Sequence, residues 1–327
     1  MTHLVTDSVT RRRLLAAMAS GAILASAPVA WAAAPMQIVA TTGMIADTAR
    51  RVGGDFVQVR GLMGPGVDPH SYRQTRSDIV AMTRADLVLW HGLYLEAQME
   101  DFFAKLSRNR SVVAVAENVP KGLLRGHDDY DGRYDPHVWM APQLWRHVVD
   151  AVRDALAAAR PENTALFAEN AEAFKAELTE LHAYGTNVLA TVPPQSRILL
   201  TAHDAFGYFG QHYGFEVLGI QGISTESEAG LNRISTLVDL LVDRQIAAVF
   251  VESSVSDRNM RALIEGAAAR GHQVRIGGEL FSDAMGPDGS YEGTYLGMID
   301  HNMTTISRAL GGTAPVRGAM GKLAAGS

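Results

Sequence analysis

Hydrophobic and polar positions follow two alternating patterns along most of the chain. Short apolar runs that are rich in β-branched residues alternate with longer stretches in which apolar residues recur every three or four positions. The short runs predict β-strands, and the longer stretches predict amphipathic helices. A regular alternation of the two is typical of a mostly parallel sheet that is covered by helices. The sequence therefore predicts the α/β fold class.

This alternation occurs in both halves of the chain. In the first half we predict strands at residues 37–41, 57–63, 87–90 and 112–116 and helices at 44–52, 78–84, 95–106 and 142–159. In the second half we predict strands at 197–201, 216–220, 248–251 and 273–276 and helices at 205–213, 231–244, 259–270 and 294–310, followed by a frayed tail after Gly311. We expect two α/β lobes, at residues 35–160 and 193–327, each with a mostly parallel sheet flanked by helices.

A long stretch between the halves predicts one continuous helix over residues 161–192. Its apolar residues are mostly three or four positions apart: Phe167, Ala171, Phe174, Leu178, Leu181, Val188 and Val192. Pro161 suits the first turn of a helix, and Pro193 and Pro194 provide a stop. At 1.5 Å per residue the helix would be roughly 45 Å long, joining the lobes as a stiff strut that limits hinge closure. The alternative is two helices that are broken at Gly185.

The first 34 residues have the plan of a cleavable export signal. Three arginines at positions 11–13 precede an uncharged, alanine-rich run from Leu14 to Pro35 that ends in small residues. Arginines followed by two leucines suggest the twin-arginine export route, and the general route is the alternative. A transmembrane anchor is a second alternative, because the run approaches about 20 residues. We expect residues 1–34 to be removed and the mature chain to be soluble in the periplasm.

The composition limits the available chemistry. The 327-residue chain has no cysteine and is 47% hydrophobic, which excludes a disordered chain, a disulfide scaffold, thiolate metal sites and a cysteine nucleophile. Any bound metal ion must therefore be held by His, Asp or Glu. Removing residues 1–34 changes the net charge from −6 to −8, so we expect no nucleic-acid partner.

Three of the eleven histidines lie at junctions between a predicted strand and a predicted helix. His70 and His137 each end an Asp-Pro-His sequence, and His203 follows the first strand of the second half. Proline fixes its own φ and favours extended geometry in the residue before it, which stiffens the presentation of the imidazole. Because ligands collect beyond the carboxyl ends of parallel strands, these three histidines are candidate metal ligands.

Most other histidines are interpreted as ordinary surface or packing residues: His147, His182, His212, His272 and His301. His3 lies within the predicted signal. His127 begins an acidic segment with Asp128, Asp129 and Asp131, which predicts a solvated turn that could collect cations only weakly.

A carboxylate is the candidate fourth ligand. Asp283 follows the last predicted strand, at the same kind of junction as the histidines. Glu252, Glu226 and Glu228 are rival carboxylates, and spacing alone does not separate them from Asp283.

At this point the chain resembles a known family, the metal-binding solute-binding proteins of bacterial zinc and manganese ABC transporters (the ZnuA/TroA-like family), most closely its TroA-like branch. The resemblance covers nearly all of the mature chain and rests on an ordered set of segments at residues 68–70, 135–139, 201–209, 222–225, 251–254 and 277–286. It implies two lobes bridged by one long helix, with a metal ion buried at their interface. Carried over position by position, the family's ligands fall on His70, His137, His203 and Asp283.

The resemblance also bears on the cargo and the partners. It implies Zn²⁺ or Mn²⁺ as transported cargo, an ABC-transporter permease as partner and a monomeric binding protein. Manganese-specialised relatives often have Glu at the third ligand position, where this chain has His203. Many zinc-specialised relatives carry a long histidine-rich loop, where this chain has only the segment at residues 127–131. The sequence therefore fits neither specialist pattern fully.

Two other functions are weighed against metal capture. A secreted metal-dependent hydrolase would use Glu252 as its base, but four protein ligands leave no position for a substrate or an activated water. A siderophore-binding protein of the same fold would not need three junction histidines. We therefore predict a binding protein and not an enzyme, with a small closure and local rearrangement around Asp283 on loading.

Overall fold

A four-stranded parallel sheet forms the centre of the first half. Its strands are β1 (Met36–Ala40), β2 (Val57–Gly61), β3 (Leu87–Trp90) and β4 (Val112–Ala114), in the order β2-β1-β3-β4. Four helices cover it: α2 (Gly43–Gly53), α3 (Arg76–Arg84), α4 (Glu100–Leu106) and α5 (Pro142–Ala159). Ile38 and Leu89 on one face belong to the core with α2 and α5, whereas Val39 and Val88 on the other face pack with α3 and α4. Because both faces are buried at the centre of the sheet, β1 and β3 are mostly apolar, whereas the edge strand β2 alternates apolar and polar residues.

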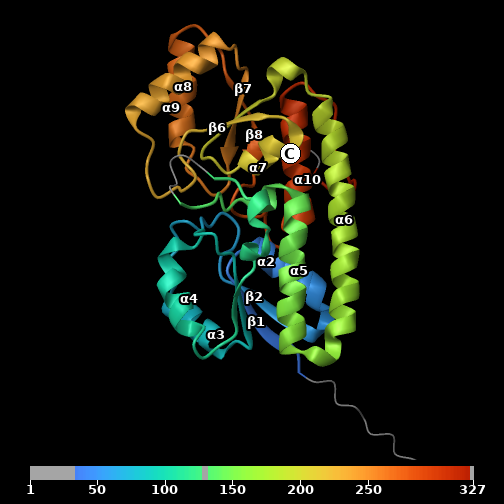
Figure 1. Cartoon of the computed structure of the whole chain (residues 1–327). Helices are drawn as coiled ribbons and strands as arrows, with labels where there is room; N and C mark the ends of the chain where they lie inside the picture. The colour runs from blue at the N-terminus through green and yellow to red at the C-terminus, as the bar shows by residue number, and fades with distance from the viewer. Residues whose placement is uncertain (1–33, 127–131, 325–327) are drawn as a thin grey trace, which may run out of the picture. The chain divides into compact units, whose positions relative to one another are not determined.

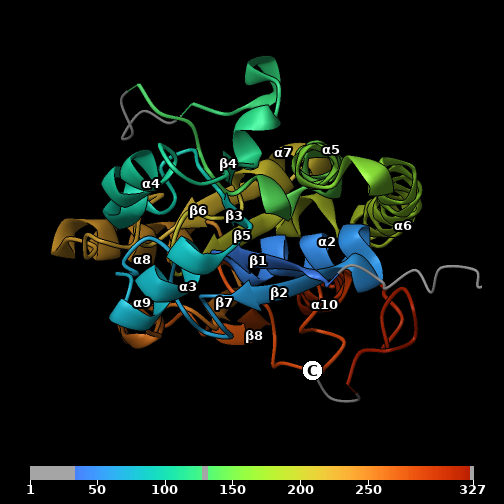
Figure 2. The same cartoon turned by 90° about the horizontal axis from the view of Figure 1, so that it is seen from below.

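The second half also contains four strands, but they form two parallel pairs. These are β5 (Ile198–Thr201) with β6 (Glu216–Gly219), and β7 (Ala248–Glu252) with β8 (Arg275–Leu280). Their helices are α7 (Gly207–Tyr213), α8 (Leu231–Asp243), α9 (Arg258–Ala269) and α10 (Tyr295–Ala309). β5 lies against β7, so the two pairs stand side by side. Figures 1 and 2 show α8 and α9 together on the outside of this half.

The helix α6 (Thr164–Ala190) runs without interruption between the two halves, as predicted. It contacts α2 and α5 of the first half and α7 and α10 of the second, and Figure 1 shows it lying along α5. Gly185 does not break the helix. A Cβ at this position would lie 2.5 Å from Met303 Sδ on α10, so the glycine allows the two helices to approach closely.

The structure corrects two predictions for the last part of the chain, namely the end of the strand predicted at 273–276 and the frayed tail. β8 continues to Leu280, past the Gly277-Gly278 pair that would normally weaken a strand, because Gly277 passes against the ring of Phe250 on β7. The tail after Gly311 is not frayed: Leu323 is fully buried, and the backbone N–H of Ala319 donates to the Asp300 carboxylate at 2.9 Å. Sequence periodicity does not reveal a tail that is held by single contacts.

The computed structural model describes residues 34–126 and 132–324. The predicted export signal and the His127–Asp131 segment therefore lie outside the described residues, apart from Ala34. Within those two ranges, no helix has both the length and the apolar character that are needed to cross a bilayer. The α/β class with parallel sheets and a long helix is confirmed.

Candidate metal centre

The four candidate ligands come together in one buried cluster. His70, His137, His203 and Asp283 each offer a ligand atom, and these atoms all lie within 4.8 Å of one another. None of the four residues is more than 2% exposed. His70, His203 and Asp283 lie in the loops that follow β2, β5 and β8, and His137 lies in the loop before α5. Each half of the chain thus supplies two of the side chains.

The distances between the ligand atoms fit one small cation. A zinc ion with bonds of about 2.0–2.1 Å would hold tetrahedral ligand atoms about 3.3–3.4 Å apart. His70 Nε2 lies 3.3 Å from His137 Nε2, and His203 Nε2 lies 3.1 Å from Asp283 Oδ2. The Asp283 oxygens lie 3.5 Å from His137 Nε2 and 3.9 Å from His70 Nε2. The atoms are therefore close to the separations that coordination requires.

Three of these atoms have no hydrogen bond within the described part of the chain. They are His203 Nε2 and the two carboxylate oxygens of Asp283, all of them buried. His203 Nε2 and Asp283 are within ion-pair distance but are not in hydrogen-bond geometry. A buried polar atom without a partner costs about 1–3 kcal/mol, so such atoms are rare in folded proteins unless they serve a ligand. This arrangement favours a cation between the two halves.

Two further carboxylates orient the histidine rings. Asp135 Oδ1 accepts hydrogen bonds from the backbone N–H of His137 (3.0 Å) and from its Nδ1 (2.8 Å). Glu252 accepts from the backbone N–H of His203 through Oε1 (2.9 Å) and from its Nδ1 through Oε2 (2.5 Å). Each carboxylate favours the tautomer in which Nδ1 carries the proton and Nε2 presents its lone pair to the cluster.

Replacing Glu252 by glutamine is expected to weaken metal binding by about 10–100-fold, as is typical when a partner that orients a ligand is altered. Glutamine has one acceptor oxygen where glutamate has two, so its NH₂ group would face one of the two N–H donors of His203. Competition titration with a chromophoric zinc chelator measures the change. Glu228→Gln is the matched control, because Glu228 is exposed and bonds Asn259. Equal affinities in the two variants would contradict an orienting role for Glu252.

This role of Glu252 argues against the hydrolase alternative, and the structure distinguishes Asp283 from the other candidate carboxylates. Both oxygens of Glu252 already accept hydrogen bonds from His203, so the side chain is not a free base. Glu226 and Glu228 lie outside the cluster, where they bond Gln98 and Asn259. His147, His182, His212, His272 and His301 also lie outside it, in agreement with their interpretation as ordinary surface or packing residues.

The charges of the cluster shift the pKa values of its members in the metal-free protein. Burial lowers the pKa of His70 to about 3. Burial also opposes protonation of His137, but its hydrogen bond to Asp135 and the negative charges of Asp135 and Asp283 outweigh it and raise the pKa of His137 to about 9. For His203, burial is likewise outweighed by neighbouring carboxylates, and the pKa lies well above 6.5. Burial would raise the pKa of Asp283, yet the adjacent His203 and His137 hold it well below 3.8. Protons thus compete with a cation for this site.

Hydrogen bonds join the ligand loops across the two halves. Trp139, two residues after His137, donates from Nε1 to the carbonyl of Ser282, which immediately precedes Asp283 (2.7 Å). Asp68, two residues before His70, accepts from Thr225 Oγ1 at 2.6 Å. Each of these bonds therefore ties a ligand loop of the first half to a loop of the second.

His91 lies beside the site but is not singled out by the sequence analysis. It is fully buried, and its Nε2 lies 2.7 Å from the carbonyl oxygen of Pro136, next to His137. Burial lowers the pKa of His91 to about 3, so the ring is neutral and Nε2 donates the hydrogen bond. Its ring also packs edge-on against Trp139. His91 directly follows β3, and this junction position is the signal that could have identified it.

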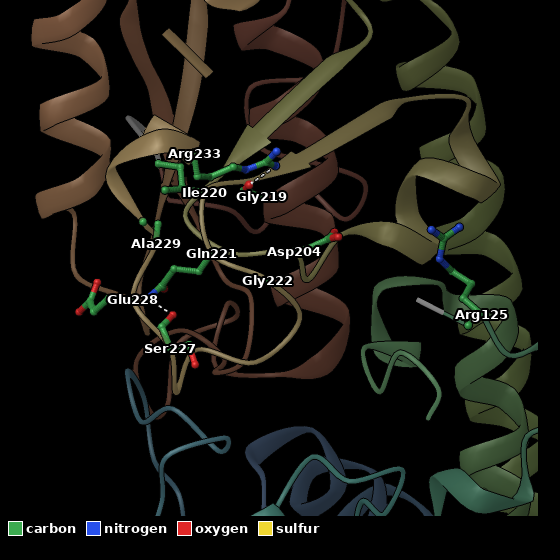
Figure 3. A pocket seen from close by; sticks show the side chains of 12 residues that line it. Arg125, Asp204, Gly219, Ile220, Gln221, Gly222, Ser227, Glu228, Ala229 and Arg233 are labelled. Atoms are coloured by element: carbon green, nitrogen blue, oxygen red, sulfur yellow. Dashed lines mark hydrogen bonds between the residues drawn. The ribbon is translucent and has the colours of Figure 1, made fainter. Parts of the chain in front are cut away.

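An open groove lies next to the metal site, mostly on the second half of the chain. It has a volume of about 680 Å³ and is lined mainly by the loop at residues 219–230, together with Asp204, Arg125 and Arg233. Figure 3 shows Arg125 facing the groove from the side opposite this loop. None of the four candidate ligands lines it, although Asp204 immediately follows His203.

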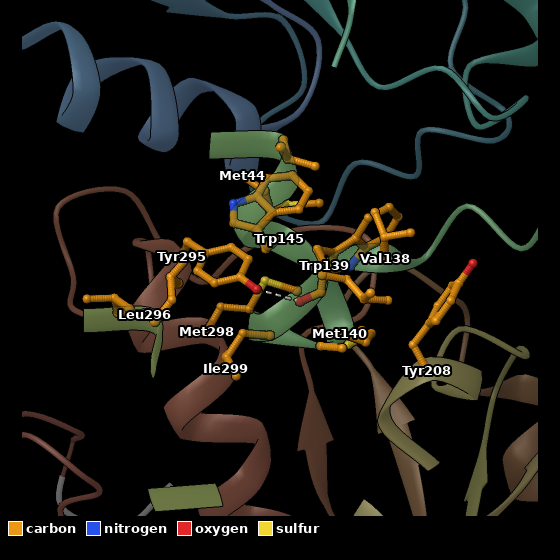
Figure 4. Packing of buried hydrophobic residues seen from close by; sticks show 14 of the residues in the cluster. Met44, Val138, Trp139, Met140, Trp145, Tyr208, Tyr295, Leu296, Met298 and Ile299 are labelled. Atoms are coloured by element: carbon orange, nitrogen blue, oxygen red, sulfur yellow. Dashed lines mark hydrogen bonds between the residues drawn. The ribbon is translucent and has the colours of Figure 1, made fainter. Parts of the chain in front are cut away.

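The core beneath the site is built around stacked aromatic rings. Trp145 on α5 and Tyr295 on α10 are stacked with their centroids 5.2 Å apart, and both are fully buried (Figure 4). Tyr295 OH donates to the backbone carbonyl of Trp139 at 2.7 Å. Trp145 Nε1 donates to Thr48 Oγ1 on α2 at 3.0 Å. These contacts fix the His137 loop to the helices of both halves.

Replacing Trp145 by alanine is expected to lower the free energy of unfolding by about 3–5 kcal/mol, because a large cavity forms in a close-packed core. Trp145→Phe keeps a ring against Tyr295 but removes the hydrogen bond to Thr48, and it is expected to cost less, about 1–2 kcal/mol. Urea unfolding of the three proteins measures both changes. A smaller loss for the alanine variant than for the phenylalanine variant would contradict this role of the ring.

The fold and the site together define an α/β binding protein with a buried three-histidine, one-aspartate metal centre. Residues 38–309 match the family model described as "Zinc-uptake complex component A periplasmic". The chain belongs to this family, whose members are transporter binding proteins and not enzymes. The resemblance that the sequence motifs indicate is thereby confirmed.

The relatives are similar over most of their length. The manganese-binding lipoprotein MntA of Bacillus subtilis is 47% identical over 275 residues, which cover 84% of this chain and 90% of that protein. The zinc-binding protein TroA of Treponema pallidum is 45% identical over 273 residues (84% and 88%). The solved structure of that TroA matches with a TM-score of 0.82 and 44% identity, and it covers 84% of this chain and 99% of the solved chain. The iron-binding protein YfeA of Yersinia pestis is 29% identical over 275 residues (84% and 86%).

Proposed function

We propose that this protein captures a divalent transition metal ion outside the cytoplasm and delivers it to the permease of an ABC transporter. The ion is the cargo, and His70, His137, His203 and Asp283 are its ligands. The observation that supports this proposal is the convergence of four buried ligand atoms within 4.8 Å of one another. Membership of a family of metal-uptake proteins agrees with it.

The donor set favours zinc as the ion that binds most tightly in vitro. Three imidazoles and one carboxylate suit a tetrahedral zinc site, whereas manganese prefers more oxygen ligands and a higher coordination number. A bidentate Asp283 would supply one more oxygen, so manganese is the second candidate cargo. The named relatives bind different metals, namely manganese, zinc and iron. Selection in the cell also follows the availability of each metal.

An organic cargo such as a siderophore agrees less well with the site. The four ligands are at most 2% exposed, and the cavity that Asp283 lines holds only about 30 Å³. That volume is far below the roughly 300–1,000 Å³ of pockets for drug-sized molecules.

Capture and delivery follow from the division of ligands between the halves. His70 and His137 would hold the ion from the first half, and His203 and Asp283 would complete the shell from the second. Because α6 packs against helices of both halves, we infer a small closure with local movement of the Asp283 loop and no wide hinge. The permease would recognise the loaded form.

The cellular location and the chain organisation are part of the proposal. We infer that residues 1–34 are an export signal and that the mature protein works in the periplasm as a soluble monomer without a lipid anchor. Its lobes would be residues 35–160 and 193–327, joined by residues 161–192.

Elemental analysis of mature protein from its native compartment tests this function. We expect one zinc or manganese ion per chain and, in cells that lack the gene, lower accumulation of the same metal. The wild-type gene should restore accumulation, and a gene encoding the His203→Ala variant should not. Metal-free protein together with normal metal content in the deletion strain would contradict the proposal. Competition between zinc and manganese in vitro then ranks the two ions.

A further inference from the structure

A buried site must be reached through the protein. All four candidate ligands are nearly inaccessible, yet one small cavity of about 30 Å³ is lined by Asp283 itself. It lies between the loop at residues 63–67 of the first half and the loop at residues 283–288 of the second. The larger groove in Figure 3 is more open but is lined by none of the ligands.

The small cavity has the capacity that a partly dehydrated ion needs. One water molecule requires about 10–15 Å³, so 30 Å³ admits an ion with little of its hydration shell. The oxygens of Asp283 are inaccessible from the cavity in this structure, but they have no hydrogen-bond partner within the described residues and can replace the lost waters once the ion reaches them. At the outer end, Asp288 is exposed and contributes a negative charge.

Met285 lines this cavity and lies two residues after Asp283. Its side chain is 8% exposed and packs against Gly43 at the start of α2, where an added Cβ would lie 2.9 Å from Met285 Cε. Methionine has three rotatable side-chain bonds and adapts readily to its surroundings. Met285 can therefore move aside without displacement of either half of the chain.

We propose that the metal ion reaches and leaves its site through this cavity, with Met285 as the gate and Asp288 as the charge at the mouth. This access channel rests on the proposed function, since it presumes that the cluster binds a metal ion. A gate changes the activation free energy for entry and exit of the ion but not the free energies of the metal-free and metal-bound states. Widening or narrowing the channel therefore changes the association and dissociation rates by the same factor and leaves the equilibrium constant unchanged.

Two variants change the width of the channel in opposite directions. Met285→Ala removes the gate, and we expect association and release of zinc to be about fivefold faster, as a barrier lowered by about 1 kcal/mol would give. Gly64 lines the channel, and a Cβ there would meet no atom within 4 Å. Gly64→Leu should therefore narrow the mouth without strain and slow both rates about fivefold. Stopped-flow mixing with zinc, and with a fluorescent chelator, measures the two rates.

Matched controls separate this route from the alternative. A Cβ at Gly222, which lines the large groove, would also meet no atom within 4 Å, so Gly222→Leu obstructs that groove in the same way. Met260→Ala removes a buried methionine from the separate core of the second half. Neither control should change the rates. Slower zinc association and dissociation in Gly222→Leu, with unchanged rates in Gly64→Leu, would overturn the proposal. Unchanged rates in both Met285→Ala and Gly64→Leu would also overturn it.

The effect of the Asp288 charge on the association rate can be recognised by its dependence on ionic strength. Asp288→Asn should slow association about twofold at low ionic strength, and the difference should vanish in high salt, because steering by an exposed charge is screened. A difference that persists in high salt would contradict a steering role. The equilibrium affinity of the wild-type protein is the separate readout for the proposed function: no zinc binding at all would refute that function, whereas tight binding with unchanged rates would refute only the channel.

Discussion

Replacing His203 by alanine is expected to lower the affinity for zinc by more than about 100-fold, which exceeds the usual effect of altering a partner that only orients a ligand. The variant loses one of four ligands from a site whose atoms are already near coordination distance. It also leaves Glu252 Oε2 buried without its donor, His203 Nδ1, although the backbone N–H of residue 203 can still donate to Oε1. Competition titration with a chelator of known affinity measures the change, and far-ultraviolet circular dichroism checks that the fold is kept.

The matched control is His301→Ala. His301 is also a buried histidine of the second half, but it bonds the backbone carbonyl of Glu279 and lies outside the cluster. Its replacement should leave zinc affinity close to the wild-type value, because His301 is not among the four grouped ligand residues. If His203→Ala and His137→Ala both kept the wild-type affinity, the site would be discarded.

Binding of zinc at neutral pH is expected to release about two protons, because ligation requires neutral imidazoles. In the metal-free protein the pKa of His137 is raised to about 9 and that of His203 lies well above 6.5. At pH 7 both rings are therefore protonated on both nitrogens and positively charged, and each must lose one proton to bind zinc. His70 and Asp283 have lowered pKa values and give up none. Calorimetric titration in buffers of different protonation enthalpy counts the protons that are released.

The direction of the pH dependence follows from the same shifts. A raised pKa in the folded state stabilises the metal-free fold below the unfolded value of 6.5, and this stabilisation is lost as the pH rises through about 9. Zinc affinity changes in the opposite sense: it falls as the pH falls and continues to rise until His137 has lost its proton. Affinity that is constant between pH 6.5 and 9 would contradict proton competition at this site.

Much of the fold follows from local patterns in the sequence. The central strands of the first half, β1 and β3, are mostly apolar because helices bury both faces of the sheet there. The sequence alone leaves two possibilities for α6, one helix or two broken at Gly185, because a glycine lowers helix propensity. Its structural reason, the close approach of Met303 to Gly185, is a tertiary contact that lies outside any local window. The course of β8 past Gly277 and the buried Leu323 depend on similar contacts.

Some residues of the site can likewise be predicted from the sequence, whereas others depend on tertiary contacts. The three histidines are predicted because strand–helix junctions of parallel sheets collect ligands. Sequence spacing alone makes Asp283 and Glu252 equally good candidates for the fourth ligand. The structure distinguishes them, because Asp283 faces His203 Nε2 in the cluster, whereas Glu252 accepts a hydrogen bond from His203 Nδ1. That distinction depends on loop conformation. The contact of His91 with Pro136 depends on it too, so the sequence could at most have suggested His91 by its position after β3.

X-ray absorption spectroscopy of the zinc-loaded protein tests the central claim most directly. We expect one ion per chain with three imidazole nitrogens and one carboxylate oxygen at about 2.0–2.1 Å. Alanine variants of His70, His137 and His203 that still retain zinc should each show one imidazole fewer. An ion whose imidazole count is the same in all three variants as in the wild type would show that these side chains do not hold it.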